Sequence, residues 1–130
     1  MTGTGLKGVV AAIPTPFEAS GSPDVARFLR LARHLLDNGC DALNVCGTTG
    51  EATSMSVRER QMVMQAAAAS LPRDRLMVGT GAAATTDAVE LTATAARLGF
   101  AAALVLPPFY YKGVSDDGVA AYLHEIIQAT

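Results

Sequence analysis

Apolar residues gather in four short runs along the chain, and a segment with helical periodicity follows each run. The runs cover residues 8–13, 42–46, 76–79 and 102–106. None of them alternates regularly with polar residues, which is typical of parallel strands that are covered on both faces. Successive runs start 26 to 34 residues apart, about the length of one strand-and-helix unit. The pattern therefore predicts an α/β chain of four βα units.

Capping residues mark where the intervening helices begin and end. The clearest start is Ser56, which forms an S-x-x-E capping box with Glu59. The first helix is expected to open at Ser22, with Pro23 and Asp24 in its first turn. Glycine favours the end of a helix because it adopts the left-handed conformation without strain. The other expected limits are Gly39 for the first helix, Leu71-Pro72 for the second, Thr85 and Gly99 for the third, and Ser115 for the start of the fourth.

Two architectures fit four βα units. One is a small doubly wound sheet and the other is half of a (β/α)8 TIM barrel. Periodicity alone does not separate them. At 130 residues without a linker or a low-complexity segment, the chain is expected to form one unit, residues 1–130.

Composition and charge narrow the functional classes. A formal net charge of −2 and the absence of tryptophan argue against partners such as nucleic acid or an anionic membrane. The apolar runs are too short to span a bilayer. The first seven residues lack the features of a signal peptide, so a cytoplasmic location is expected. Cys40 and Cys46, with no histidine nearby, are expected to be buried free thiols and not zinc ligands.

The most informative motif follows the second strand. Gly47, Thr48, Thr49, Gly50 and Glu51 place two hydroxyls between two glycines, just before an expected helix start. Free N–H groups in such a turn favour a carboxylate or phosphate oxygen. The alternative is an ordinary strand-to-helix turn in which the threonines cap the backbone locally. Glu51 is expected to anchor the helix start through the dipole and not to act as a general acid or base.

A second glycine turn follows the third strand, at Gly79-Thr80-Gly81. It invites a dinucleotide-binding interpretation, but the third glycine is missing and the next strand ends in Pro107-Pro108 in place of a ribose-binding acid. Nucleotide binding by a βαβ module stays the weaker alternative. His34 and His124 fall on outer helical faces and are expected to be surface residues.

Three segments, in order, resemble one family. They are residues 8–17, the run Gly47 to Glu51, and residues 106–111 with the pair Tyr110-Tyr111. In these segments the chain resembles the N-terminal half of the dihydrodipicolinate synthase and N-acetylneuraminate lyase family. The resemblance implies a (β/α)8 barrel whose strands 5–8 are absent from this chain. It also implies a lyase or synthase of the class I aldolase type that acts on pyruvate or another 2-oxo acid.

The resemblance assigns roles to particular residues. Thr48 and Thr49, flanked by Gly47 and Gly50, would bind the substrate carboxylate. Thr48 would also belong to a proton relay, and Tyr111 would complete that relay in a neighbouring subunit of a homo-oligomer. The family implies no metal and no organic cofactor.

The resemblance also exposes a departure from the family, whose imine-forming lysine lies on the sixth strand. This chain has only Lys7, before the first strand, and Lys112, beyond the fourth. Neither position fits a nucleophile, which must be neutral to attack a carbonyl. The chain alone is therefore expected to be inactive. The alternative is a non-catalytic half barrel that self-associates, because a bare sheet edge favours pairing.

Overall fold

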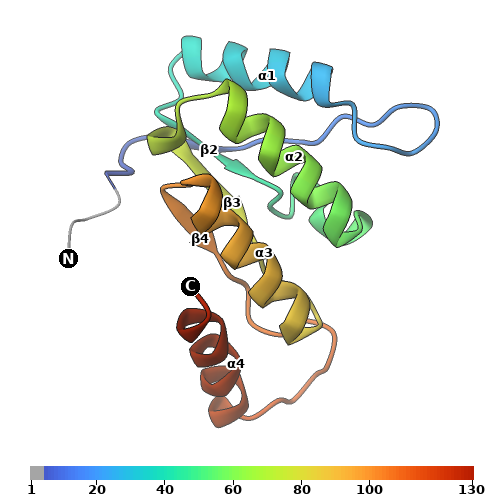
Figure 1. The fold of residues 1–130 in the computed structure, drawn as a ribbon, viewed down its shortest axis with the longest axis vertical. Coiled ribbons are helices and arrows are strands. Elements are labelled where there is room, and N and C mark those ends of the chain that lie inside the picture. Colours follow the sequence, from blue (N-terminus) through green and yellow to red (C-terminus); the bar gives the residue numbers. More distant parts are fainter. Residues whose placement is uncertain (1–4) are drawn as a thin grey trace.

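Four βα units follow one another in the computed structural model, which describes residues 5–130. The expectation that the first seven residues form no signal peptide falls partly on Met1 to Thr4, which lie outside the described residues. Figure 1 shows the four helices in chain order, with the strands beside them. The strands are β1 (Val10–Ala12), β2 (Ala42–Val45), β3 (Leu76–Gly79) and β4 (Ala102–Leu104). The helices are α1 (Val25–Asp37), α2 (Val57–Ser70), α3 (Thr85–Leu98) and α4 (Asp116–Gln128), with 3₁₀ turns at Ala52–Ser54 and Arg73–Arg75.

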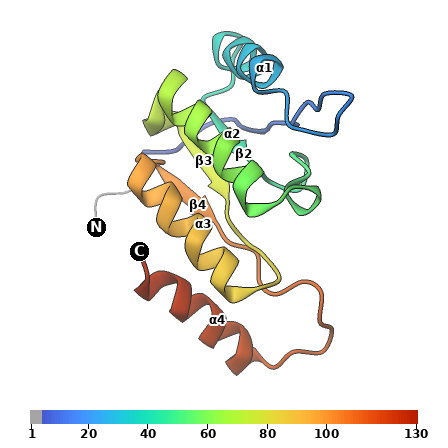
Figure 2. The same cartoon turned by 45° about the vertical axis from the view of Figure 1, so that its right-hand side comes forward.

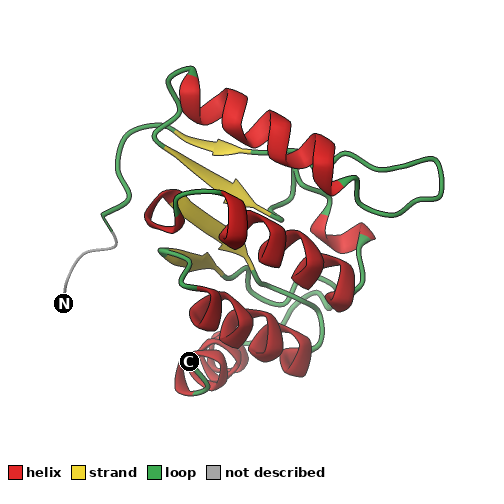
Figure 3. Ribbon diagram, turned by 45° about the horizontal axis from the view of Figure 1, so that its top comes forward, coloured by secondary structure: helices red, strands yellow, loops and turns green. Residues whose placement is uncertain are grey.

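The sheet has the sequential order β1-β2-β3-β4, and each neighbouring pair is parallel. Its register aligns Ala12 with Asn44, Asn44 with Met77, and Met77 with Ala102. Figures 2 and 3 show the helices gathered on the same side of the sheet. A doubly wound fold would reverse the strand order and place helices on both faces. The half-barrel prediction is therefore confirmed, and the doubly wound alternative is wrong.

The main core lies between the sheet and the first three helices. Alternate side chains of β2 and β3 are fully buried, because they belong to one apolar cluster with residues of these helices. Phe28 of α1 is also fully buried and is the largest such side chain. The other large members of this core are Ile13, Leu43, Val45, Val63, Met64, Leu76, Val78 and Leu91.

Most helix starts lie where the capping signals predict. The Ser56 hydroxyl oxygen accepts a hydrogen bond from the N–H of Glu59, and the Glu59 carboxylate accepts one from the N–H of Ser56, so the capping box is complete. Gly99 ends α3 in the left-handed conformation, with φ of 78°. The expectation for α1 is wrong by two residues. Asp24 caps α1 by accepting a hydrogen bond from the N–H of Arg27, while Pro23 forms a short antiparallel bridge with Phe17.

The fourth helix packs on α3 through a smaller cluster. Tyr122 and Ile126 are buried there, and the Tyr122 hydroxyl donates a 3.0 Å hydrogen bond to the carbonyl of Ala82. Ile127, next to Ile126 in the chain, is 67% exposed. Within residues 5–130, α3 is the helix against which α4 mainly packs, and Tyr122 and Ile126 are the buried residues of α4.

Candidate active site

The loop that follows β2 is tightly bent at both ends. Cys46 and Glu51 are the only non-glycine residues between positions 5 and 130 with positive φ, at 51° and 56°. Such conformations cost about 1–3 kcal/mol each and tend to persist at functional sites. We call residues 46–51 the Thr48 loop. Its bends turn the backbone sharply away from the strand, so that Thr48 and Thr49 are exposed while Gly47 and Gly50 are buried.

Two glycines allow the turns around the Thr48 loop to pack backbone against backbone. A Cβ at Gly50 would lie 3.1 Å from the carbonyl oxygen of Ile13. A Cβ at Gly79 would overlap the carbonyl oxygen of Cys46 and lie 3.2 Å from the Cα of Gly47. The turns after β1, β2 and β3 are therefore in direct contact at the carboxyl end of the sheet. In a parallel barrel this is the end at which active sites lie.

Backbone hydrogen bonds hold the Thr48 loop in shape. The carbonyl of Thr48 accepts from the N–H of Glu51 at 3.0 Å, and the buried hydroxyl of Thr15 donates to the carbonyl of Gly50 at 2.7 Å. The N–H groups of Thr48 and Thr49 have no hydrogen-bond partner within residues 5–130. Unpaired N–H groups on an exposed turn are suited to binding an anionic oxygen.

A cleft opens beside this loop, between the carboxyl ends of β2, β3 and β4. Its empty volume, including the part open to solvent, is about 450 Å³, and its lining is largely apolar with a few polar groups. Thr48 and Gly47 line the cleft, whereas Thr49 does not. The lining residues are Cys46, Gly47, Thr48, Ala52, Thr53, Arg60, Gly79, Gly81, Leu104, Leu106 and Phe109. The cleft thus brings together residues from the run Gly47 to Glu51, the Gly79-Thr80-Gly81 turn and residues 106–111, but none from residues 8–17.

One expectation about the Thr48 loop needs correction. Glu51 is expected to anchor a helix start, but the second helix opens at Ser56, as its capping box predicts, and the 3₁₀ turn Ala52–Ser54 lies between Glu51 and α2. The side chain of Glu51 caps neither segment and is exposed. The first N–H groups of α2 lie beyond this 3₁₀ turn, and its N-terminus is occupied by its own capping box. The dipole of α2 is therefore not the positive element of this site.

The positive charge at the cleft comes from Arg60 of α2, which the sequence motifs do not single out. Arg60 is 5% exposed and donates to the carbonyls of Gly79 at 2.7 Å and Gly81 at 3.1 Å. A signal for it does exist in the sequence. Arg60 lies three and four residues before Val63 and Met64, on the buried stripe of α2, where a charged residue is uncommon.

Burial changes the acidity of the Cys46 thiol, at the start of the Thr48 loop. Loss of solvent raises the pKa of the Cys46 thiol to about 11, and the positive charge of Arg60 opposes this rise. Desolvation also lowers the pKa of Arg60, partly offset by Cys46, Asp87 and Tyr122. An arginine remains protonated at neutral pH in spite of such a shift. Cys46 is a buried free thiol as predicted, whereas Cys40 is only half-buried.

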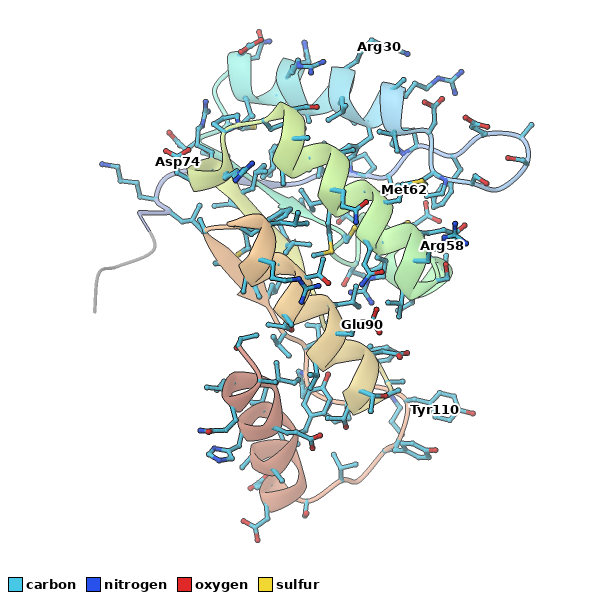
Figure 4. The ribbon with its side chains drawn as sticks, in the orientation of Figure 1. Arg30, Arg58, Met62, Asp74, Glu90 and Tyr110 are labelled. Carbon is cyan, nitrogen blue, oxygen red and sulfur yellow. The ribbon has the colours of Figure 1, made fainter. Side chains whose placement is uncertain are left out.

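The tyrosine pair lies away from the cleft. Tyr110 and Tyr111 are 73% and 70% exposed in the loop between β4 and α4, and their rings meet edge to face at 5.3 Å. Figure 4 shows Tyr110 at the periphery of this loop. Phe109, just before them, does line the cleft. Lys112 is exposed, and its ammonium donates to the carbonyl of Phe109 at 3.2 Å.

Within residues 5–130, no group of three or more His, Cys, Asp or Glu side chains is arranged to hold a metal ion. No helix in this part of the chain is long and apolar enough to cross a membrane. His34 and His124 are exposed, as expected from their helical faces.

Comparison with known proteins gives one consistent result. The dihydrodipicolinate synthetase family matches residues 5–130. A 4-hydroxy-tetrahydrodipicolinate synthase from Synechococcus sp. (strain CC9605) is 42% identical over 122 residues, which are 93% of this chain and 40% of the relative. The chain thus spans about two fifths of the length of this relative.

Solved structures agree with this result. Dihydrodipicolinate synthase from Agrobacterium tumefaciens superposes with a TM-score of 0.87 at 36% identity, over 94% of this chain and 43% of that chain. YagE from E. coli, a prophage protein of the dihydrodipicolinic acid synthase family solved with pyruvate, gives 0.86 at 25% identity, over 95% and 41%. From the match over residues 5–130 and these relatives, the chain belongs to the dihydrodipicolinate synthetase family.

Proposed function

We propose that this chain forms the carboxylate-binding half of a barrel enzyme that acts on pyruvate or a similar 2-oxo acid. The observation that carries the proposal is the exposed Thr48 loop, with the N–H groups of Thr48 and Thr49 unpaired within residues 5–130. The cleft beside it is mostly apolar with a few polar groups, which is typical of small-ligand sites. The pyruvate bound to the related YagE supports the same ligand class.

The proposed reaction begins with an imine between a lysine and the 2-oxo group. The neutral lysine nitrogen bonds to the carbonyl carbon, the two protons of the amine are transferred to the oxygen, and that oxygen leaves as water. Addition, cleavage or dehydration of a carbon chain then follows. The Thr48 hydroxyl, exposed and beside the cleft, is suited to pass protons during these steps. Tyr111 would complete the relay in the site of a neighbouring subunit of a homo-oligomer, which accords with its exposed position outside this cleft.

The lysine itself must come from outside these 130 residues. Lys7 precedes β1, at the opposite end of the strand from the Thr48 loop, and is exposed. Lys112 is exposed and donates to a backbone carbonyl. A lysine nucleophile needs a site that keeps its amine neutral, such as an apolar pocket or a neighbouring cation. We therefore propose that the chain alone binds the carboxylate but forms no imine.

A pyruvate titration followed by NMR tests the binding half of this proposal. Saturable shifts of the amides of Thr48 and Thr49 are expected. Replacing Thr48 with Val should weaken binding by roughly 10- to 100-fold, because one hydrogen bond to a charged group is worth roughly 1.5–3 kcal/mol. Thr86, exposed in the first turn of α3, provides the matched control, and Thr86→Val should bind as the wild type does. A wild-type chain that shows no saturable shift with pyruvate would overturn the proposed function.

The imine half has its own test. Borohydride reduces an imine to a stable amine, so mass spectrometry after treatment with pyruvate and borohydride reports any imine. No added mass is expected for this chain. Trapping on Lys112 or Lys7 would contradict the proposal that the nucleophile lies elsewhere.

A second candidate, the self-associating half barrel, also has an observation in its favour. Within residues 5–130, β1 and β4 each pair on one side only, and Leu104 and Leu106 are 40% and 43% exposed. A bare edge beside apolar side chains favours pairing with another chain. Sedimentation velocity distinguishes the candidates. If the chain forms a concentration-dependent dimer and neither the monomer nor the dimer binds pyruvate, the non-catalytic candidate is favoured.

A further inference from the structure

Arg60 is the only charged side chain that lines the cleft in the described part of the chain. Its side chain is almost fully buried, at 5% exposure, and no carboxylate within residues 5–130 forms a salt bridge with it. Its Nε atom is buried without any hydrogen-bond partner. Its two other nitrogens donate to the carbonyls of Gly79 and Gly81. The guanidinium is thus held in place by two carbonyls and forms no salt bridge within residues 5–130, although the charge of Asp87 acts on it and raises its pKa against the effect of burial.

A buried charge without a salt bridge is unusual because desolvation of an ion costs several kcal/mol. Buried charges are normally paired with an opposite charge or a metal. The two carbonyl oxygens supply partial negative charge, yet the net charge of the guanidinium remains. The arrangement is therefore most favourable when an anion occupies the cleft.

We propose that Arg60 determines the ligand specificity of the cleft, by favouring a 2-oxo acid over a neutral compound of the same shape. This inference rests on the proposed function and adds a third element to it. The Thr48 loop supplies hydrogen bonds that an uncharged oxygen also accepts, whereas Arg60 supplies a positive potential that acts only on charge. Arg60 is assigned no part in proton transfer.

Contacts connect Arg60 to the Thr48 loop. The guanidinium donates to the carbonyl of Gly79, a position at which an added Cβ would meet the Cys46 carbonyl and the Cα of Gly47. The charge of Arg60 also acts on the first residue of the Thr48 loop, since it lowers the pKa of the Cys46 thiol against the effect of burial. A positive potential therefore exists at the base of the loop on which the carboxylate is proposed to bind.

The test compares two ligands that differ in charge but hardly in shape. Pyruvate and pyruvamide are titrated by NMR into the full chain, and the ratio of their dissociation constants gives the preference for the anion. Arg60→Gln removes the charge and keeps an amide that can donate. Arg60→Lys keeps a positive charge but loses the fork that reaches two carbonyls. Arg58→Gln is the matched control, because Arg58 lies two residues away on the exposed side of α2 and changes the net charge equally (Figure 4).

The preference for pyruvate should fall about tenfold in Arg60→Gln, a change that corresponds to about 1.4 kcal/mol. It should stay close to the wild-type value in Arg58→Gln, and Arg60→Lys should retain most of it. If Arg60 served only in packing, Arg60→Gln would weaken the binding of pyruvate and pyruvamide equally and leave the ratio of their dissociation constants unchanged. If Arg60→Gln does not fold, Arg60→Met, which keeps a long apolar stem, takes its place in the same comparison.

Two failures are distinguishable. A wild-type chain that binds pyruvate with a preference that survives removal of the Arg60 charge would overturn this inference and leave the proposed function standing. A wild-type chain that does not bind pyruvate would overturn the proposed function and, with it, this inference.

Discussion

Replacing Gly79 with Ala should strongly destabilise the fold, because β3 has no room for a methyl group beside the Thr48 loop. The added Cβ would overlap the Cys46 carbonyl oxygen and lie 3.0 Å from its carbon and 3.2 Å from the Cα of Gly47. All three atoms belong to the backbone, so no side-chain rotation relieves the overlap. Bringing these contacts to the roughly 3.5–4.0 Å optimum requires the strand ends to separate by about 1 Å.

We expect the free energy of unfolding to fall by about 3 kcal/mol, at the upper end of the usual cost of overpacking. With a urea m-value of about 1.5 kcal/mol per molar, the midpoint of unfolding should drop by about 2 M. Gly118→Ala in α4 is the control, because the atom nearest to its Cβ is the Ser115 hydroxyl, which belongs to a side chain. The free energy of unfolding of Gly118→Ala should stay within about 1 kcal/mol of the wild-type value. A Gly79→Ala chain as stable as the wild type would refute the backbone contact described here.

Three further outcomes follow from the structure. Tyr122→Phe should destabilise by about 1 kcal/mol in urea unfolding, because it leaves the buried carbonyl of Ala82 without its 3.0 Å hydrogen bond; no change would argue against that contact. Burial raises the pKa of the Cys46 thiol to about 11, so as the pH rises above 9 this thiol ionises in the unfolded chain before it ionises in the folded one. The free energy of unfolding should therefore fall by about 2–3 kcal/mol between pH 9 and 11. The loss should be absent in Cys46→Ala, measured by urea unfolding at each pH. Ser56→Ala should cost about 1 kcal/mol, because it removes the acceptor for the N–H of Glu59 at the start of α2; an unchanged midpoint would contradict this role.

The sequence alone was sufficient for the order and type of the elements. Continuous apolar runs and capping residues are local signals, and they predicted four strands and four helices that the structure contains. Residues that cap a helix do so through neighbours three positions away, so Ser56 and Gly99 were visible without any tertiary information. The same signals misplaced the start of α1, where Ser22 and Asp24 are both good caps and only the bridge between Phe17 and Pro23 decides between them.

The sequence also indicated where the site lies, since parallel strands bring their carboxyl ends to one edge. The Thr48 loop, the Gly79 turn and Phe109 do meet there. Periodicity alone did not decide the sheet type, because it reports which faces are covered and not the order in which strands pair; the resemblance to a barrel family pointed to the order that the structure has.

Only the tertiary structure revealed what makes the cleft positive. The sequence attributed this property to a helix start after Glu51, but the chain first forms a 3₁₀ turn there and α2 begins later. Arg60 reaches the cleft because α2 packs its buried stripe against β3, where two carbonyls hold the guanidinium. The charge of a side chain is fixed by its type, but its burial and its partners depend on contacts between residues 19 and 21 positions apart in the chain.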